Sequence, residues 1–178
     1  FRLDDPLITA SDKAAAGARA QRFFRLARGY ALRGQLGRAL FITCGPTGCG
    51  KSTLAAELAF QLGLLHLSSD HERKRLAGVK PTERNSTIYS QAWNQATYDR
   101  LFELSRSALE AGVPVIVDAT FRTAQERRRF LQMASDSGAA SVLLGLTCPS
   151  ELARQRLEKR EKQGNGVSDG TWQVYRQQ

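Results

Sequence analysis

The segment GPTGCGKST, residues 45–53, constrains the fold of this chain more than any other feature of its sequence. It begins with the pattern G-x-x-x-x-G-K-[ST], which is typical of a loop that wraps the phosphates of a nucleotide. Such a loop connects a buried strand to a helix, whose free backbone N–H groups and positive end face the phosphates. The pattern therefore predicts an α/β fold with a parallel sheet and a nucleotide site at the carboxyl ends of its strands.

The residue types in this segment each have a predicted role. The glycines permit a tight backbone that approaches the phosphates closely. Lys51 is expected to bridge the β- and γ-phosphates, and the Ser52 hydroxyl is expected to ligate Mg²⁺. ATP is the expected nucleotide, because the sequence lacks the N-K-x-D signature of guanine binding. The predicted nucleotide-binding residues are Gly45, Pro46, Thr47, Gly48, Cys49, Gly50, Lys51, Ser52 and Thr53.

Apolar runs and amphipathic stretches alternate along the rest of the chain. Strands are predicted at residues 38–43, 64–69, 113–118 and 141–147, and helices at 12–36, 51–62, 71–78, 87–111, 124–137 and 151–163. Thr123 and Glu126 form a predicted capping box. Strands that alternate with helices form a parallel sheet covered on both faces. We expect the strand order 2-3-1-4 with right-handed crossovers, a helical extension over residues 1–37 and one domain over residues 38–178.

Composition limits the class of protein. A chain of 178 residues with 42% hydrophobic content is long enough for one domain with a full core. The sequence has no apolar run of membrane-spanning length and no signal peptide, so we expect a cytoplasmic protein without a membrane partner. Three cysteines without a C-x-x-C pair disfavour disulfides and zinc. The net charge of +9 predicts acidic partners such as nucleotides or polynucleotides. The chain starts at Phe1 and ends within a predicted helix, which suggests a piece of a longer polypeptide.

Two carboxylates lie where predicted strands end, next to the phosphate loop. Asp70 is either a general base for an acceptor hydroxyl or the N-cap of the helix that follows. Asp118 is expected to support the metal site by holding a water of the Mg²⁺ or the Ser52 hydroxyl. The alternative is a strand-end carboxylate paired with an arginine. An ATPase that activates water usually has a glutamate after its second acidic strand, whereas this chain has Ala119. The sequence therefore favours transfer to a hydroxyl over hydrolysis.

Four segments together resemble P-loop kinases of the polynucleotide 5′-hydroxyl kinase and zeta-toxin type: GPTGCGKST, SSDHERKRL, VIVDATF and RLEKREKQGNGVSD. The resemblance covers residues 38–178. It implies that Asp70 is the general base, that Arg73 binds a phosphate of the acceptor and that Asp118 supports the metal site. It also implies a lid at residues 151–170 that clamps the triphosphate, for which Arg156 and Arg160 fit as an i, i+4 pair. Without the resemblance, these two arginines suit a solvated helix face.

The resemblance has two further implications. The family usually has a fifth strand after the lid helix, which would lie beyond Gln178. The chain is more similar still to the nucleotide kinase-like half of bacterial two-part proteins whose upstream half resembles an aminoglycoside phosphotransferase. This similarity predicts an upstream fused domain, with the helix at residues 12–36 joining the two halves.

Several functions remain open on the sequence alone. The favoured one is a kinase that acts on the 5′-hydroxyl of a polynucleotide, because basic residues outnumber acidic ones between residues 70 and 86. Alternatives are a kinase for a small molecule such as a nucleoside, sugar or aminoglycoside, and an ATP-sensing module that transfers nothing. A nucleic-acid-binding module is disfavoured, because Trp93, Trp172 and Tyr175 are too scattered to form a stacking platform.

Overall fold

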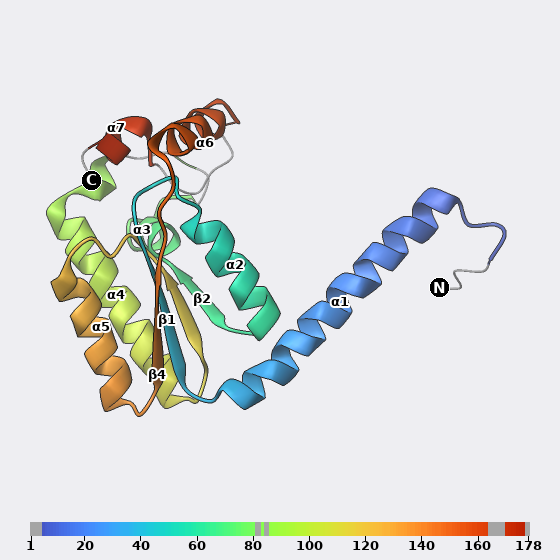
Figure 1. Ribbon diagram of the computed structural model, residues 1–178, viewed down its shortest axis with the longest axis horizontal. Helices are drawn as coiled ribbons and strands as arrows, with labels where there is room; N and C mark the ends of the chain where they lie inside the picture. Colours follow the sequence, from blue (N-terminus) through green and yellow to red (C-terminus); the bar gives the residue numbers. More distant parts are fainter. Residues whose placement is uncertain (1–4, 81–82, 84–85, 164–169, 177–178) are drawn as a thin grey trace.

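The computed structural model describes residues 5–80, 83, 86–163 and 170–176. Four parallel strands form one sheet in the order β2-β3-β1-β4, which confirms the predicted order (Figure 1). The strands are β1 Ala39–Cys44, β2 Leu65–Ser68, β3 Val115–Asp118 and β4 Ala140–Gly145. Because β1 and β3 are neighbours, the phosphate loop after β1 lies beside Asp118 at the end of β3.

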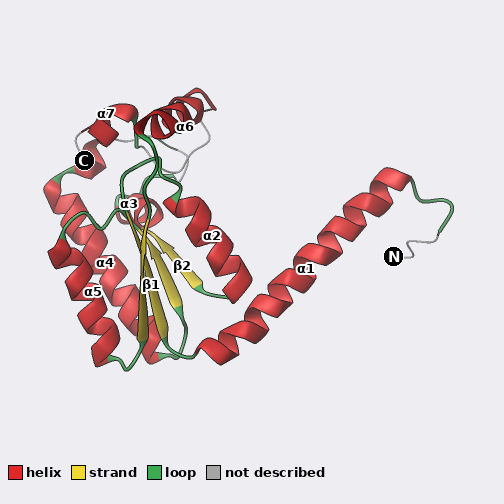
Figure 2. Cartoon of the chain, viewed as in Figure 1, coloured by secondary structure: helices red, strands yellow, loops and turns green. Residues whose placement is uncertain are grey.

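Helices connect the strands and pack on both faces of the sheet, with α4 and α5 on one face and α2 on the other (Figure 2). Within the described residues, no helix combines the length and the apolarity needed to cross a bilayer. The helices are α1 Ala10–Leu36, α2 Lys51–Leu62, α3 Ser69–Leu76, the 3₁₀ helix η1 Ser86–Tyr89, α4 Gln91–Glu110, α5 Ala124–Asp136, α6 Ser150–Gln163 and α7 Trp172–Arg176.

The two central strands supply the core. Leu40, Ile42, Val115 and Val117 are buried in the cluster that contains α4 and α5, whereas Ile116 is buried against α2. Every residue of β3 is buried, as its near-continuous apolar run predicts for a central strand. Each fully buried aliphatic side chain contributes about 1.5–3 kcal/mol, so the phosphate loop and Asp118 extend from the most strongly anchored strands.

Two of the predicted element boundaries that were wrong bear on the site. The second strand ends at Ser68, which is the N-cap of α3, so Asp70 lies in the first turn of the helix and is not its N-cap. The helix predicted at residues 87–111 is divided, because Ser90 caps α4 by accepting a hydrogen bond from the Trp93 N–H at 3.4 Å, and η1 precedes it. The capping box of Thr123 and Glu126 is confirmed at the start of α5.

The two outermost elements are only partly covered. At β4, an edge strand of the described sheet, Val142 and Leu143 are exposed. In α1, the large side chains of Phe23 and Tyr30 are also exposed to solvent. The C-terminal half of α1 packs on α2, and its N-terminal half extends away from the sheet (Figure 1). The fifth strand, the domain boundary at residue 38 and the upstream domain stay predictions.

Candidate active site

The phosphate loop is built from backbone conformations that favour glycine. Gly45, Gly48 and Gly50 have φ values of 133°, 85° and 99°, which side chains with a Cβ rarely adopt. Space is also limiting, because a Cβ on Gly45 would overlap the carbonyl of Leu146 and one on Gly48 would lie 3.1 Å from Cγ of Leu157. No side chain caps the start of α2 at Gly50. The first N–H groups of α2 are therefore available to an anion.

Lys51, the first residue of α2, is buried within this loop. Its Nζ donates hydrogen bonds to the carbonyl oxygens of Gly45 and Pro46, both at 2.8 Å. Desolvation by burial lowers the pKa of Lys51, while the nearby Asp118 and Asp70 oppose the shift. The ammonium group is therefore held inside the loop, with Asp118 and Asp70 close enough to act on its charge.

Asp118 ends β3 with its side chain buried. The end of β3 is tied to β1 through Thr43, whose hydroxyl accepts from the Ala119 N–H at 3.3 Å. One Asp118 oxygen lies 3.8 Å from Nε2 of His66 on β2. Asp118 and the exposed Ser52 line the same cleft, and both have oxygen atoms that can act as metal ligands. Mg²⁺ is usually coordinated by a few such protein oxygens together with waters and phosphate oxygens. The residues present thus fit a magnesium ion bound with a nucleotide.

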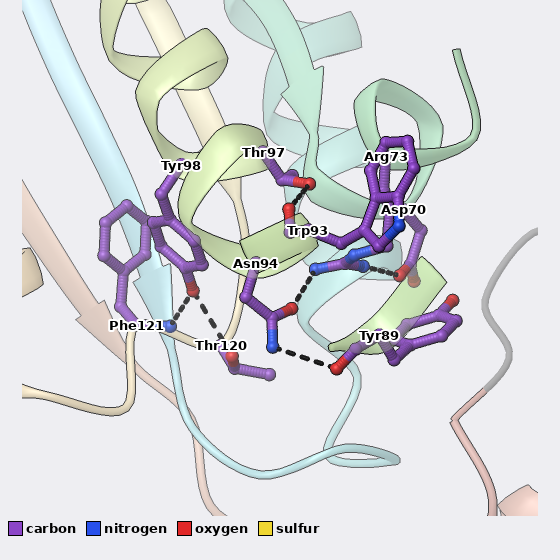
Figure 3. A network of polar contacts seen from close by, with 9 residues as sticks. All are labelled: Asp70, Arg73, Tyr89, Trp93, Asn94, Thr97, Tyr98, Thr120 and Phe121. Carbon is purple, nitrogen blue, oxygen red and sulfur yellow. Dashed lines mark hydrogen bonds and ion pairs between the residues drawn. The ribbon is translucent and has the colours of Figure 1, made fainter. Parts of the chain in front are cut away.

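Asp70 and Arg73 form the centre of a polar network on the other side of the cleft (Figure 3). Arg73 donates from Nη1 to Asp70 and from Nη2 to Asn94 Oδ1, both at 3.0 Å. The guanidinium is 4.6 Å from the centre of the Tyr89 ring, and the Asn94 amide donates to the Tyr89 carbonyl at 3.3 Å. Arg73 is only 6% exposed, so its position is set by the protein rather than by solvent. The base predicted at Asp70 thus lies next to a fixed cation.

The helix α6 lies over the phosphate loop. Its buried residues Ala153 and Leu157 face Gly48, and Arg156 Nη1 lies 3.7 Å from where a Cβ of Gly50 would be. Arg160, one turn later, donates from Nη2 to the Gly170 carbonyl at 2.5 Å. The predicted lid at residues 151–170 includes the segment GNGVSD, which lies outside the described residues. Both predicted lid arginines therefore lie on a helix that borders the nucleotide side of the cleft.

One cleft of about 2520 Å³ brings all the predicted site residues together. It is lined by the loop residues 45–53, by Asp70 and Arg73, by Asp118, and by Arg156 and Arg160. The structure thus places these side chains around one cleft, while their roles stay predictions.

Sequence reasoning missed the residues that hold this site in place. Neither Asn94 nor Tyr98 is among the predicted site residues. Their i, i+4 spacing, with an amide and a phenol on one helix face, was the signal that could have found them. His66 was missed because nothing in the sequence shows which side chain of β2 faces Asp118.

Comparison with known proteins agrees with this geometry. The first of three similar solved structures is the Pnkp1/Rnl/Hen1 RNA repair complex, with a TM-score of 0.63 and 19% identity over 79% of this chain and 42% of that one. The second is a kinase candidate from Chloroflexus aurantiacus, with a TM-score of 0.61 and 22% identity over 71% of this chain and 68% of that one. The third is the APS kinase of Mycobacterium tuberculosis in complex with AMPPNP and APS. Its TM-score is 0.53, with 20% identity over 71% of this chain and 72% of that one.

At these sequence identities, structural similarity shows that the chain has the P-loop kinase fold. It does not show which substrate the chain uses. The chain spans less than half of the RNA repair protein that it matches. No curated protein sequence matches it. A family model described as an AAA domain, AAA_33, matches residues 40–178. Since this match covers most of the chain, including the phosphate loop, Asp70, Asp118 and both lid arginines, the chain belongs to the AAA_33 family of P-loop domains.

Proposed function

We propose that this chain is an ATP-dependent kinase that transfers the γ-phosphoryl group to an acceptor hydroxyl, with Asp70 as general base. The observation that carries the proposal is the placement of the Asp70–Arg73 pair in the same cleft as Lys51 and the phosphate loop. A module that only senses ATP needs no such pair. A hydrolytic ATPase needs a residue that activates water, and Ala119 stands where that glutamate is usual.

In the proposed reaction, the acceptor oxygen attacks the γ-phosphorus while the bond from that phosphorus to the bridging oxygen breaks. The bond's electron pair leaves with ADP, and the hydroxyl proton passes to Asp70. Lys51 would exchange its two carbonyl contacts for phosphate oxygens, and Arg156 and Arg160 would add positive charge as the transition state forms. Mg²⁺, held by Ser52 and by Asp118 through water, would neutralise charge on the phosphates.

For the acceptor we propose the 5′-hydroxyl of a polynucleotide. Arg73 offers a buried guanidinium beside the base, which suits a phosphate next to the reacting hydroxyl. The cleft of about 2520 Å³ also exceeds the roughly 300–1,000 Å³ of sites for small ligands, which leaves room for more than one nucleotide beside ATP. A small-molecule kinase is the competing proposal, with Asp70 in the same role.

The test is transfer of label from γ-labelled ATP to a panel of acceptors: 5′-hydroxyl oligonucleotides, nucleosides, sugars, aminoglycosides and water alone. We expect label in the oligonucleotides, with acceptor affinity that falls as salt rises because several phosphates are contacted. Faster transfer to a nucleoside or aminoglycoside, or salt-independent acceptor affinity, would establish the small-molecule kinase instead. Release of label to water without transfer to any acceptor would contradict the kinase proposal.

A further inference from the structure

The start of α4 takes part in holding the Arg73 side chain. The guanidinium donates from Nη1 to Asp70 and from Nη2 to Asn94, and its face packs on the Tyr89 ring (Figure 3). Its Nε is buried without a hydrogen-bond partner among the described residues. Because Arg73 is buried, water can replace a lost partner only in part. The direction of the guanidinium therefore depends on the two side chains that accept from it.

Asn94 is itself held in one orientation. Its backbone N–H donates to the Ser90 carbonyl at 2.9 Å, in the first turn of α4. Its side-chain nitrogen donates to the Tyr89 carbonyl at 3.3 Å, which directs the amide oxygen toward Arg73. The end of η1 and the start of α4 thus act together on the guanidinium.

The contact with Arg73 engages one oxygen of the candidate base. Asp70 Oδ1 accepts from Arg73, whereas the structure gives Oδ2 no hydrogen bond with another described residue. The Asp70 side chain is partly exposed and lines the cleft together with Arg73 and Asn94. A general base needs an oxygen that can accept the proton and a fixed direction toward the hydroxyl. In Asp70, Arg73 sets the direction and Oδ2 is left to accept the proton.

A neutral amide suits position 94 better than a carboxylate does. A carboxylate attracts a guanidinium more strongly than an amide oxygen does, so an aspartate at position 94 would compete with Asp70 for Arg73. It would also place an oxygen against the Tyr89 carbonyl, to which the Asn94 amide donates. The amide therefore supports Arg73 and leaves the ion pair to Asp70.

We propose that Asn94 is a positioning residue of the acceptor site, which orients the Arg73 guanidinium and, through it, the Asp70 carboxylate. This inference rests on the proposed function, in which Asp70 takes the proton of the acceptor hydroxyl. In that reaction Asn94 touches neither the γ-phosphate nor the hydroxyl. Without its amide, Asp70 stays in the cleft, and the direction of the carboxylate is set less tightly.

The first measurement follows Arg73 by NMR of the ¹⁵N-labelled chain, with its side-chain signals assigned by their absence in Arg73→Ala. A guanidinium held on both Nη atoms rotates slowly about its Cζ–Nη bonds. We expect Asn94→Ala to speed this rotation about tenfold or more, the factor for loss of one hydrogen bond to a charged group. Tyr98→Phe is the control, because Tyr98 lies one turn later on α4 and accepts from the Phe121 N–H at 3.0 Å instead. It should leave the Arg73 signals unchanged.

The second measurement is single-turnover transfer from γ-labelled ATP to a 5′-hydroxyl oligonucleotide. Asn94→Ala should lower the rate about 10- to 100-fold, because the base is misplaced, and leave ATP affinity unchanged. Asn94→Asp, which is nearly the same size, should lower it at least as much. In an Arg73→Ala background, Asn94→Ala should cause no further loss, because its effect passes through Arg73. Gln132→Ala removes an amide that is bonded to Asp136 outside the cleft, and should transfer at the rate of the parent protein.

Unchanged Arg73 signals in Asn94→Ala would overturn the positioning role, whatever the activity of the parent protein. A loss of rate in the Arg73→Ala background as large as in the parent background would also overturn it, as would full activity of Asn94→Asp. Faster rotation of Arg73 in Asn94→Ala, without transfer by the parent protein to any acceptor of the panel, would support the positioning of Arg73 and contradict the proposed function. If the parent protein phosphorylates a small molecule instead, the same rates are decisive with that acceptor, because Asp70 has the same role.

Discussion

At the scale of single residues, Lys51 is a cation that the fold buries at a cost. Desolvation is the largest influence on the pKa of Lys51 and favours the neutral amine. The two backbone carbonyls that Lys51 contacts replace its hydration only in part. In the proposed function Lys51 binds the nucleotide, and residues placed for function often reduce stability.

The shift of this pKa predicts a pH dependence. Because the pKa of Lys51 is lower in the folded than in the unfolded chain, protonation favours unfolding. The cost is fully present below the folded-state pKa and disappears as pH rises past the unfolded-state pKa. Chemical denaturation of the parent protein and of Lys51→Met should therefore show the parent gaining free energy of unfolding relative to the variant as the pH rises through the alkaline range to the ordinary lysine pKa of 10.5.

The same variant should lose phosphoryl transfer, because in the proposed function the lysine contacts the nucleotide and not the core. Lys13→Met, which removes a lysine of α1 that does not line the cleft, is the control and should alter neither quantity. A constant difference in unfolding free energy across this pH range would contradict the assigned direction of the shift.

At the scale of secondary-structure elements, the packing of α1 on α2 depends on one glycine. A Cβ on Gly29 would lie 2.5 Å from the Phe60 carbonyl, whereas one on Gly34 of the same helix would meet nothing within 4 Å. Gly29→Ala should therefore loosen α1, seen as faster amide exchange and proteolysis over residues 10–36. Gly34→Ala should stabilise the helix by about 0.5–1 kcal/mol, as alanine usually does. Equal behaviour of the two variants would contradict the described packing of α1.

The helix α6 offers a second matched pair of variants, at two of its arginines. Arg160 lines the cleft, whereas Arg154 of the same helix is exposed and paired with Glu158. Arg160→Ala should lower kcat more than it raises KM for ATP, because charge redistributes in the transition state. Arg154→Ala should leave both unchanged. An effect of Arg160→Ala on KM alone would make Arg160 a contact to ground-state ATP.

Most elements could be predicted from the sequence because local signals and packing agree. The Gly-rich loop, the apolar run of β3 and the capping box at Thr123 each specify a structure within a few residues of the chain. The break between η1 and α4 was not predicted, because apolar spacing continues through Ser90. The contacts of Asn94 with Arg73 and of Tyr98 with Phe121 could not be predicted, because they join residues 21 and 23 positions apart and depend on how α4 crosses the sheet.

At the scale of the whole molecule, the sheet order explains why the candidate site residues meet. The order β2-β3-β1-β4 places the ends of β1, β2 and β3 side by side, so the loop with Lys51, the start of α3 with Asp70 and the terminal Asp118 surround one cleft. In the proposed function, segments distant in sequence then supply nucleotide contacts on one side and acceptor contacts on the other. The fold alone does not determine which acceptor is used.

The most direct test of the central claim is single-turnover transfer from γ-labelled ATP to a 5′-hydroxyl oligonucleotide by Asp70→Asn. The amide preserves an acceptor for Arg73 but cannot take the hydroxyl proton. Asp136→Asn, an exposed carboxylate on α5, is the control. We expect transfer by Asp70→Asn to fall about 10²- to 10⁴-fold, with ATP affinity unchanged and the control fully active. Transfer by Asp70→Asn at the rate of the parent protein would contradict the account, because the carboxylate would then not be the base.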